Sequence, residues 1–418
     1  MDYSSSLDFW LQNAAETFGT PSYVYVASAI EQRAAMLRAA FGDRFALSFA
    51  AKSNPNPAVL DFMRHHVEFL DVSSIGEFRT ALAAGWLPER ISFTGPGKRG
   101  FEIREAIEGG VGELILESLR EAVLADEAAR KLGRVQRVLI RIAPASVPKG
   151  FGDQMAGRPS AFGIDWEVAA EQIPKIAKLA NLQIVGLHIY SGTQCLKAEA
   201  VCENYRNFLQ LFGEAYETGL PPPEKLIFGS GLGIPYHDGD LPLDLGAVVA
   251  GISTDLDAFT SQPRFADTRL VLELGRYLIG EAGYFLTRVI AIKESRGVRI
   301  GICDGGMNNH LPASGHFGMV MHRNYAMHKV GGYGEPEKIN LVGPLCTSID
   351  RLAIGVVLPR IEEGDLVAVH NSGAYGLTAS PIHFISHAPP CEVMAEAGGL
   401  RDITYIPALP LAAGSPPI

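Results

Sequence analysis

The sequence predicts an α/β protein whose core is a (β/α)8 barrel, accompanied by a smaller β domain. Up to about residue 279, eight short apolar, β-rich runs alternate with amphipathic stretches of helical length. Beyond that point, strand-like runs and turns follow with little helical pattern. The length of 418 residues is sufficient for a barrel of roughly 250 residues together with a second domain.

The expected barrel strands are 45–50, 67–71, 91–94, 113–116, 137–142, 184–190, 225–229 and 268–273. The helical patterns between them include Glu31–Phe41, Ile75–Ala84, Leu119–Leu132, Glu167–Ala180 and Glu203–Thr218. Periodicity alone would also fit a doubly wound sheet. The barrel is favoured because Lys52, Tyr190, the glycines after 228 and Arg276 fall at the C-terminal ends of expected strands, where barrels place their active sites.

The second domain is predicted from the remaining β-rich runs, 284–293, 297–302, 339–343, 366–370 and 402–406. Another such run, Ser22–Val26, precedes the barrel pattern. The tail after Pro407 is expected to be irregular and partly mobile.

Composition excludes several classes of protein. A hydrophobic content of 47% with 20% charged residues is typical of a globular chain. The net charge of −10 argues against nonspecific nucleic-acid binding. No apolar stretch approaches the ~18 residues of a membrane span, and the N-terminus lacks the pattern of a signal peptide. The five cysteines are scattered, odd in number and without Cys-x-x-Cys spacing, which predicts reduced thiols in a cytoplasmic protein with no metal site.

Lys52 is the most informative candidate residue. It follows an apolar strand, where a low-dielectric pocket can depress the pKa of the amine and make it a nucleophile. A solvated loop lysine is the alternative. The segment 50–57 (AAKSNPNP) resembles the cofactor-lysine motif of the fold type III pyridoxal-phosphate decarboxylases, the family of diaminopimelate and ornithine decarboxylase. Matching segments continue to about residue 385. The resemblance implies an alanine-racemase-like barrel in which Lys52 forms a Schiff base with pyridoxal 5′-phosphate (PLP).

Three segments resemble the phosphate contacts of that family. The first is 229–233 (GSGLG), whose Gly229, Gly231 and Gly233 would let backbone N–H groups approach an anion. On its own such a loop more often serves as a turn. The resemblance adds Thr193, which matches a serine hydroxyl of the family, and Tyr375, which matches its Gly-Ala-Tyr step.

Glu273 and Arg276 lie in a segment, 273–276 (ELGR), that resembles the family's Glu-Pro-Gly-Arg. The resemblance places Glu273 against the pyridine nitrogen, which it keeps protonated so that the ring accepts electrons from the carbanion left by CO2. Racemases of this fold have an arginine there, so Glu273 favours decarboxylation. Arg276 matches an arginine that holds phosphate or the substrate carboxylate. The alternative is an ion pair between Glu273 and Arg276.

Cys346 lies in 342–350 (VGPLCTSID), which resembles the family's Gly-Pro-x-Cys segment. A single cysteine is usually a small core residue. The resemblance instead implies that Cys346 reprotonates the quinonoid carbon after decarboxylation, in the active site of a partner subunit. It therefore implies a homodimer with shared sites, a PLP-binding barrel over 28–278, and a β domain over 1–27 and 279–418 that contributes the cysteine segment and the dimer interface.

Other matches are less specific. Arg141, Asp71 and Glu77 match charged residues near the cofactor, although Asp71 could equally begin a helix. His188 matches a family histidine that is either structural or functional. The pattern assigns no role to Lys98, His310, His316 or Arg323.

Two departures from the family pattern bear on the substrate. Tyr190 stands where relatives stack a histidine on the cofactor, so an aromatic face remains but a positive charge does not. Thr347 stands where relatives have a carboxylate that receives the distal amino group of the substrate. A hydroxyl cannot pair an ammonium, so lysine, ornithine and diaminopimelate are disfavoured.

The segments 304–311, 314–318, 323–325 and 373–381 resemble a branch that contains glutamyl-acyl-carrier-protein and exosortase-associated decarboxylases. We therefore expect PLP-dependent α-decarboxylation of an amino acid, free or carried by an acyl carrier protein, with Thr347, Arg276 and Tyr375 contacting the substrate. The alternatives are a diaminopimelate- or ornithine-type decarboxylase and a racemase, the latter disfavoured by Glu273 and Cys346. A noncatalytic single-barrel protein is disfavoured by the β domain.

Overall fold

The computed structural model describes residues 3–217, 219–315 and 323–406. Eight parallel strands form a closed barrel in the order β5–β4–β3–β2–β12–β11–β9–β6, and β5 pairs with β6 to complete the ring. Their bounds are β2 Ala46–Ala50, β3 Phe69–Val72, β4 Ile91–Phe93, β5 Glu113–Leu116, β6 Gln136–Ala143, β9 Leu182–Ile189, β11 Lys225–Gly229 and β12 Arg269–Leu274. The short strand β8 (Ile164–Asp165) adds to the end of β6.

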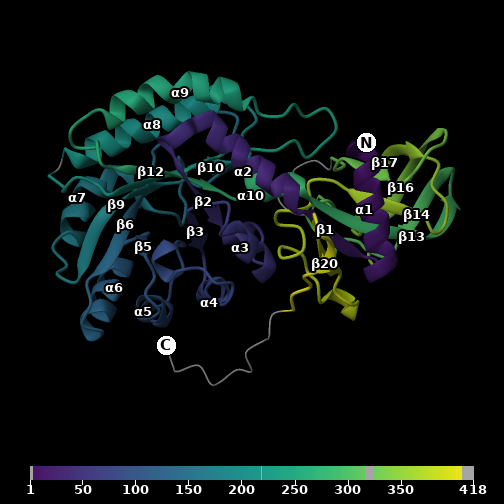
Figure 1. Cartoon of the computed structure of the whole chain (residues 1–418), viewed down its shortest axis with the longest axis horizontal. Coiled ribbons are helices and arrows are strands. Elements are labelled where there is room, and N and C mark those ends of the chain that lie inside the picture. Colours follow the sequence, from purple (N-terminus) through teal and green to yellow (C-terminus); the bar gives the residue numbers. More distant parts are fainter. Residues whose placement is uncertain (1–2, 218, 316–322, 407–418) are drawn as a thin grey trace.

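Helices cover the outside of the barrel, as Figure 1 shows. They are α2 Ala27–Phe41, α3 Pro57–Met63, α4 Ile75–Ala83, α5 Gly100–Glu108, α6 Leu119–Lys131, α7 Trp166–Ile176, α8 Ala198–Tyr216, α9 Leu245–Thr260 and α10 Arg276–Ile279. Their buried faces are apolar and pack on the strands. No helix in the described part of the chain is long and apolar enough to span a membrane.

The (β/α)8 prediction is confirmed, and every expected barrel strand differs from its observed bounds by no more than two residues at either end. Apolar strands that are buried on both faces are easily recognised, because they read as continuous hydrophobic runs. The sequence analysis did not single out the helices α3, α5 and α9, nor α1 (Tyr3–Phe18), which packs on the second sheet.

The second sheet has the order β17–β16–β14–β13–β1–β19–β20, with β18 paired to β13 and β15 paired to β18. Its strands are β1 Ser22–Val26, β13 Gly283–Ser295, β14 Val298–Cys303, β15 Met327–Lys329, β16 Pro336–Val342, β17 Arg351–Pro359, β18 Leu366–Val369, β19 Cys391–Glu396 and β20 Gly399–Asp402. Strand β1 lies between β13, to which it is antiparallel, and β19, to which it is parallel. Figure 1 shows this sheet beside the barrel.

The predicted strand 402–406 is wrong. The ladder ends at β20, because the Asp402 carboxylate accepts the Thr404 N–H at 2.9 Å and the Thr404 hydroxyl at 2.6 Å, which turns the chain out of the sheet. The runs that form β15, β17 and β19 were not recognised. The tail after Pro407, the end of Glu203–Thr218 and His316 lie outside the described residues.

The two ends of the barrel interior differ in polarity. Its middle is filled by the side chains Ile115, Leu139, Val185, Ile227 and Val271. At the N-terminal end, Lys225 Nζ and Glu113 Oε1 form a buried ion pair at 2.7 Å. The polar candidates of the sequence analysis lie at the opposite end.

Candidate functional site

The C-terminal ends of the barrel strands bring the main candidates together. Lys52 lies in a 3₁₀ turn directly after β2, and Asp71 is in β3. Tyr190 follows β9, and Glu273 is in β12. Lys52 Nζ lies 5.4 Å from the centre of the Tyr190 ring. This end of the barrel therefore holds a lysine, an aromatic face and two carboxylates at one place.

The pKa of Lys52 differs from the expectation. Burial among other residues lowers the pKa of the amine, but the phenols of Tyr375 and Tyr190 and the carboxylates of Glu273 and Asp71 raise it by more. The pKa of the Lys52 amine is therefore raised, and the expectation that it is lowered is wrong for the protein without its cofactor. The side chain is exposed to solvent even though protein surrounds it, so a small molecule can reach it.

Glu273 is buried, with 2% of its surface exposed, and Oε2 lies 3.3 Å from Nε2 of the fully buried His188. Burial raises the pKa of Glu273, but His188, Lys52 and Arg141 lower it by more, so this carboxyl stays ionised. No ion pair joins Glu273 to Arg276 among the described residues, so the structure gives no support to that alternative.

Asp71 does not begin a helix, because its carboxylate accepts the hydroxyls of Ser92 and Thr94 inside the barrel. Ser74 caps α4 instead, accepting the Glu77 N–H. Burial and the nearby charge of Glu273 raise the pKa of Asp71. Of the two neighbouring carboxyls, Asp71 is therefore the one that retains a proton more readily.

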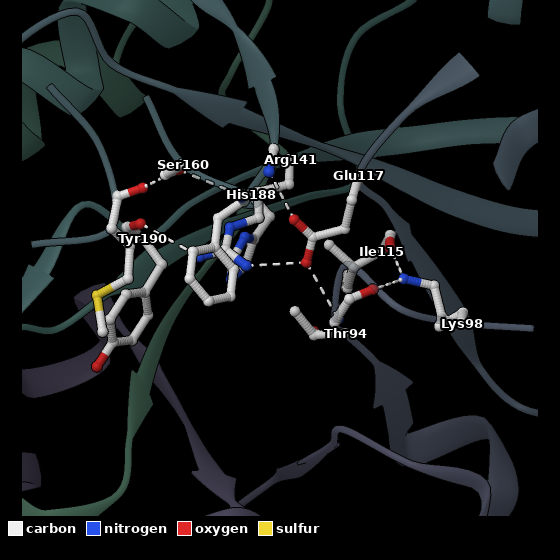
Figure 2. Close-up of polar contacts among 12 residues, drawn as sticks. Thr94, Lys98, Ile115, Glu117, Arg141, Ser160, His188 and Tyr190 are labelled. Carbon is white, nitrogen blue, oxygen red and sulfur yellow. Dashed lines mark hydrogen bonds and ion pairs between the residues drawn. The ribbon is translucent and has the colours of Figure 1, made fainter. Parts of the chain in front are cut away.

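Arg141 belongs to a buried network that Figure 2 shows. Its Nη1 atom donates to Glu117 Oε1 at 2.8 Å, and its Nη2 atom donates to the Tyr190 carbonyl at 3.4 Å. Glu117 also accepts the N–H groups of Gly163, at 2.6 Å, and Gly95, at 3.0 Å. The sequence analysis missed Glu117, although a carboxylate directly after the apolar strand β5 was a visible signal.

The glycine segment 229–233 lies close to its neighbours. A Cβ on Gly229 would lie 2.3 Å from the Tyr190 ring, and one on Gly231 would lie 2.5 Å from Phe151. Gly231 also has a φ of +69°, which favours glycine. The N–H of Gly233 donates to Cys195, whereas the N–H groups of Gly231 and of residue 232 have no acceptor in the described part of the chain.

Thr193 lies beside the glycine segment. It belongs to β10 (Gly192–Thr193), which pairs with β7 (Asp153–Gln154). Two residues further on, the Cys195 N–H donates to the Gly231 carbonyl at 2.9 Å. The structure therefore brings two of the three predicted phosphate contacts to one place.

Tyr375 and Arg276 connect the second sheet to this end of the barrel. The N–H of Tyr375, a residue with φ of +59°, donates to the Ser53 carbonyl at 2.8 Å. The Arg276 guanidinium lies 5.1 Å from the centre of the Tyr375 ring and donates from Nη1 to the Tyr236 hydroxyl at 3.1 Å. The third predicted phosphate contact thus lies directly beside the Lys52 turn.

The Cys346 segment is a turn of the second sheet. Cys346 is exposed and Thr347 is half-buried. Asp350 holds the turn, because its buried carboxylate accepts the N–H groups of Met307, at 2.6 Å, and Leu345, at 2.8 Å. No hydrogen bond, ion pair or ring contact joins Cys346 or Thr347 to Lys52 in the portions of one chain that the structure describes.

Three residues without a predicted role have structural contacts. Lys98 is buried and pairs with Glu121 at 3.0 Å. His310 is buried and lies 2.9 Å from the Ser372 hydroxyl through Nε2, and burial lowers its pKa to about 3. Arg323 pairs with Asp240 at 2.8 Å on the surface.

Two buried polar atoms of the site bear on whether it can hold PLP. Glu273 Oε2 and Arg276 Nε are buried without a hydrogen-bond partner in the described residues. Such atoms are costly unless something pairs with them. A protonated ring nitrogen would suit the first, and a phosphate would suit the second together with the free N–H groups of the glycine segment. The residues present therefore fit this cofactor.

Comparisons with known proteins agree with this fit. The family model described as the pyridoxal binding domain of pyridoxal-dependent decarboxylases matches residues 27–280. The chain is 35% identical to the L-glutamyl-BtrI-acyl-carrier-protein decarboxylase of Niallia circulans, covering 91% of this chain and 90% of that protein. It is 31% identical to the diaminopimelate decarboxylase of Aquifex aeolicus, in an alignment that covers 94% of this chain and 90% of that protein.

Solved structures show the same likeness. The diaminopimelate decarboxylase from M. jannaschii superposes with a TM-score of 0.86 at 27% identity, over 94% of this chain and 91% of that one. A structure of an SrLDC mutant in complex with PLP has a TM-score of 0.80 at 25% identity. The superposition covers 92% of this chain and 94% of the mutant.

The glycine segment yields a direct test. We expect Gly231→Ala to weaken PLP binding by about tenfold or more, because the new methyl group would displace Phe151 and disturb the unpaired N–H donors. Titration of the cofactor-stripped protein with PLP measures this. Gly239→Ala is the matched control, since Gly239 has a φ of +84° but open space around its Cβ position. Equal losses in both variants would indicate backbone strain rather than a cofactor contact.

Proposed function

Because the chain belongs to the pyridoxal-dependent decarboxylases, we propose that it removes the α-carboxylate, as CO2, from an amino acid whose distal end carries no ammonium group. A glutamyl-type substrate, free or attached to an acyl carrier protein, fits this description. The 35% identity to a glutamyl-carrier-protein decarboxylase supports the proposal.

Thr347 is the observation on which the substrate class rests. A substrate ammonium that enters a partly desolvated site needs a carboxylate to pair with it. Thr347 offers only a hydroxyl, and the nearest acidic residue of the turn, Asp350, already accepts two backbone N–H groups. The turn therefore favours a neutral or acidic distal group.

The cofactor would be held by residues from both sheets. Lys52 would bond to it covalently, the segment 229–233 with Thr193 and Tyr375 would bind its phosphate, and Tyr190 would lie against its ring. Arg276 would contact the phosphate or the substrate carboxylate. When bound, PLP supplies an electron-accepting ring that stabilises the carbanion left by CO2.

Glu273 would hold a proton on the ring nitrogen of the cofactor. Its pKa is lowered by His188, Lys52 and Arg141, so it presents a negative charge to that nitrogen. His188, whose Nε2 atom lies 3.3 Å from Glu273 Oε2, would orient the carboxylate. A preorganised charge in a buried site acts strongly, because nothing has to reorganise during the reaction.

Cys346 would donate a proton from Sγ to the substrate α-carbon after CO2 leaves. Within one chain the cysteine is exposed and makes no contact with Lys52 in the described residues, which agrees with a role in the site of a partner subunit. We therefore propose a homodimer in which each site combines the barrel of one subunit with the Cys346 turn of the other.

A diaminopimelate-type activity is the second candidate, because two relatives with that name, from Aquifex aeolicus and Methanothermobacter thermautotrophicus, are 31% and 32% identical to this chain. It would require another residue to supply the charge that Thr347 lacks.

The role of Glu273 predicts the effect of its neutral isostere. Glu273→Gln should lower the rate of CO2 release by about a hundredfold, on the order of ~3 kcal/mol, because an amide does not hold the ring nitrogen in its protonated form. Release of labelled CO2, with cofactor content checked by absorbance, measures this. Near-normal turnover with cofactor bound would contradict the assignment.

The shared site predicts complementation between two inactive variants. Equal mixing of Lys52→Ala and Cys346→Ala chains after dissociation should restore about a quarter of native activity, because half of the dimers are mixed and each of these has one intact site. Each variant refolded alone is the control. Absence of recovery in purified mixed dimers would show that each site is built within one chain.

The substrate class is tested by steady-state kinetics. We expect kcat/KM for glutamate or a glutamyl thioester on a carrier protein to exceed the values for ornithine, lysine and diaminopimelate by at least about a hundredfold, because an unpaired distal ammonium is strongly disfavoured. Thr347→Glu should move activity towards the diamino acids. Efficient turnover of a diamino acid by the unchanged protein would refute the substrate proposal.

A further inference from the structure

Asn56, in the Lys52 segment 50–57, has an amide whose nitrogen and oxygen are both hydrogen-bonded within the protein. Its Nδ2 atom donates to Glu392 Oε2 at 2.9 Å and to the Ile403 carbonyl at 2.8 Å. Its Oδ1 atom accepts the Ala58 N–H at 2.9 Å and so caps α3. Both amide hydrogens of Asn56 are therefore taken by protein acceptors.

Asn54 makes a second link from the same turn. Its Nδ2 atom donates to the Gly373 carbonyl at 3.1 Å, and its Oδ1 atom accepts the Asn56 N–H at 3.2 Å. Between Asn54 and Lys52, the Ser53 carbonyl accepts the Tyr375 N–H. Positions 53, 54 and 56 are thus each hydrogen-bonded to residues that follow the barrel in the sequence, of which Glu392 lies in β19.

Glu392, in β19, is the acceptor at the centre of these contacts. Besides Asn56, its carboxylate accepts the Tyr25 hydroxyl at 3.0 Å and the Tyr405 N–H at 3.4 Å. Only 3% of its surface is exposed. A buried carboxylate is costly unless donors surround it, so this arrangement requires the asparagine to stay in place.

We propose that Asn54, Asn56, Tyr25 and Glu392, here called the asparagine cluster, position Lys52 for its bond to the cofactor. Two hydrogen bonds hold the turn within its described residues: the Asn54 N–H donates to the Ala51 carbonyl, and the Ser53 hydroxyl donates to the Ala50 carbonyl. The cluster fixes the backbone of the turn from outside. Small displacements of a reacting group are costly, so fixing the turn favours bond formation.

This inference rests on the proposed role of Lys52 as the residue that bonds to the cofactor. PLP carries an aldehyde that condenses with an amine and releases water, whereas pyridoxamine phosphate has the same ring and phosphate but no aldehyde. The ratio of their dissociation constants therefore measures the contribution of the lysine, apart from the rest of the site.

The experiment titrates the cofactor-stripped full-length protein with each compound, followed by absorbance and protein fluorescence. Asn56→Ser keeps a good helix cap but removes both donors to the second sheet. It should weaken PLP binding by about tenfold or more while changing pyridoxamine phosphate binding by less than about threefold. Asp244→Ala, which removes the cap of α9, is the matched control. It should change neither of the two dissociation constants.

Glu392→Gln provides a second test that preserves shape. Its amide keeps one acceptor oxygen but sets an NH2 group against the other donor, Asn56 or Tyr25, so PLP binding should weaken in the same direction. The comparison is made in a variant whose thermal midpoint matches that of Asp244→Ala. If that variant loses affinity equally for PLP and pyridoxamine phosphate, or loses affinity for neither, the proposal is overturned. Lys52→Ala should abolish the preference for PLP; if it does not, the role of Lys52 fails, whatever the cluster variants show.

Discussion

Glu273 lies at the end of β12 with 2% of its surface exposed, and its Oε2 atom receives no hydrogen bond from the described residues. An ionised carboxylate in such a place would cost several kcal/mol without compensation. His188, Lys52 and Arg141, from three other strand ends, provide that compensation. The basic groups at the barrel mouth balance this one charge, and burial together with the charge of Glu273 raises the pKa of its acidic neighbour Asp71.

The sequence revealed the features that depend on local pattern. Apolar runs located the barrel strands, and the polar residues that follow them marked the end at which the site lies. The family resemblance added the lysine, the glycine segment and the cysteine turn as candidates. The structure confirmed the fold and showed that the barrel candidates lie together, whereas their chemical roles stay predictions.

Features that depend on long-range contacts could not be read from the sequence. The sign of the Lys52 pKa shift is set partly by Tyr375, which is distant in the chain. Glu117 has partners from strand β6 and from two different loops. Burial of a single residue can be guessed from its neighbours in sequence, but the identity of the groups that surround it cannot.

Strand β1 has a consequence for how the chain is made. Ser22 pairs with Leu286 in β13 and with Cys391 in β19, so the whole barrel sequence separates β1 from both of its partner strands. Until β13 and β19 pair with it, both edges of β1 are unpaired. Closing such distant contacts is slow, and unpaired edges invite association with other chains. Deletion of β19 should therefore lower the yield of soluble protein more than its six residues suggest, because one edge of β1 would stay unpaired.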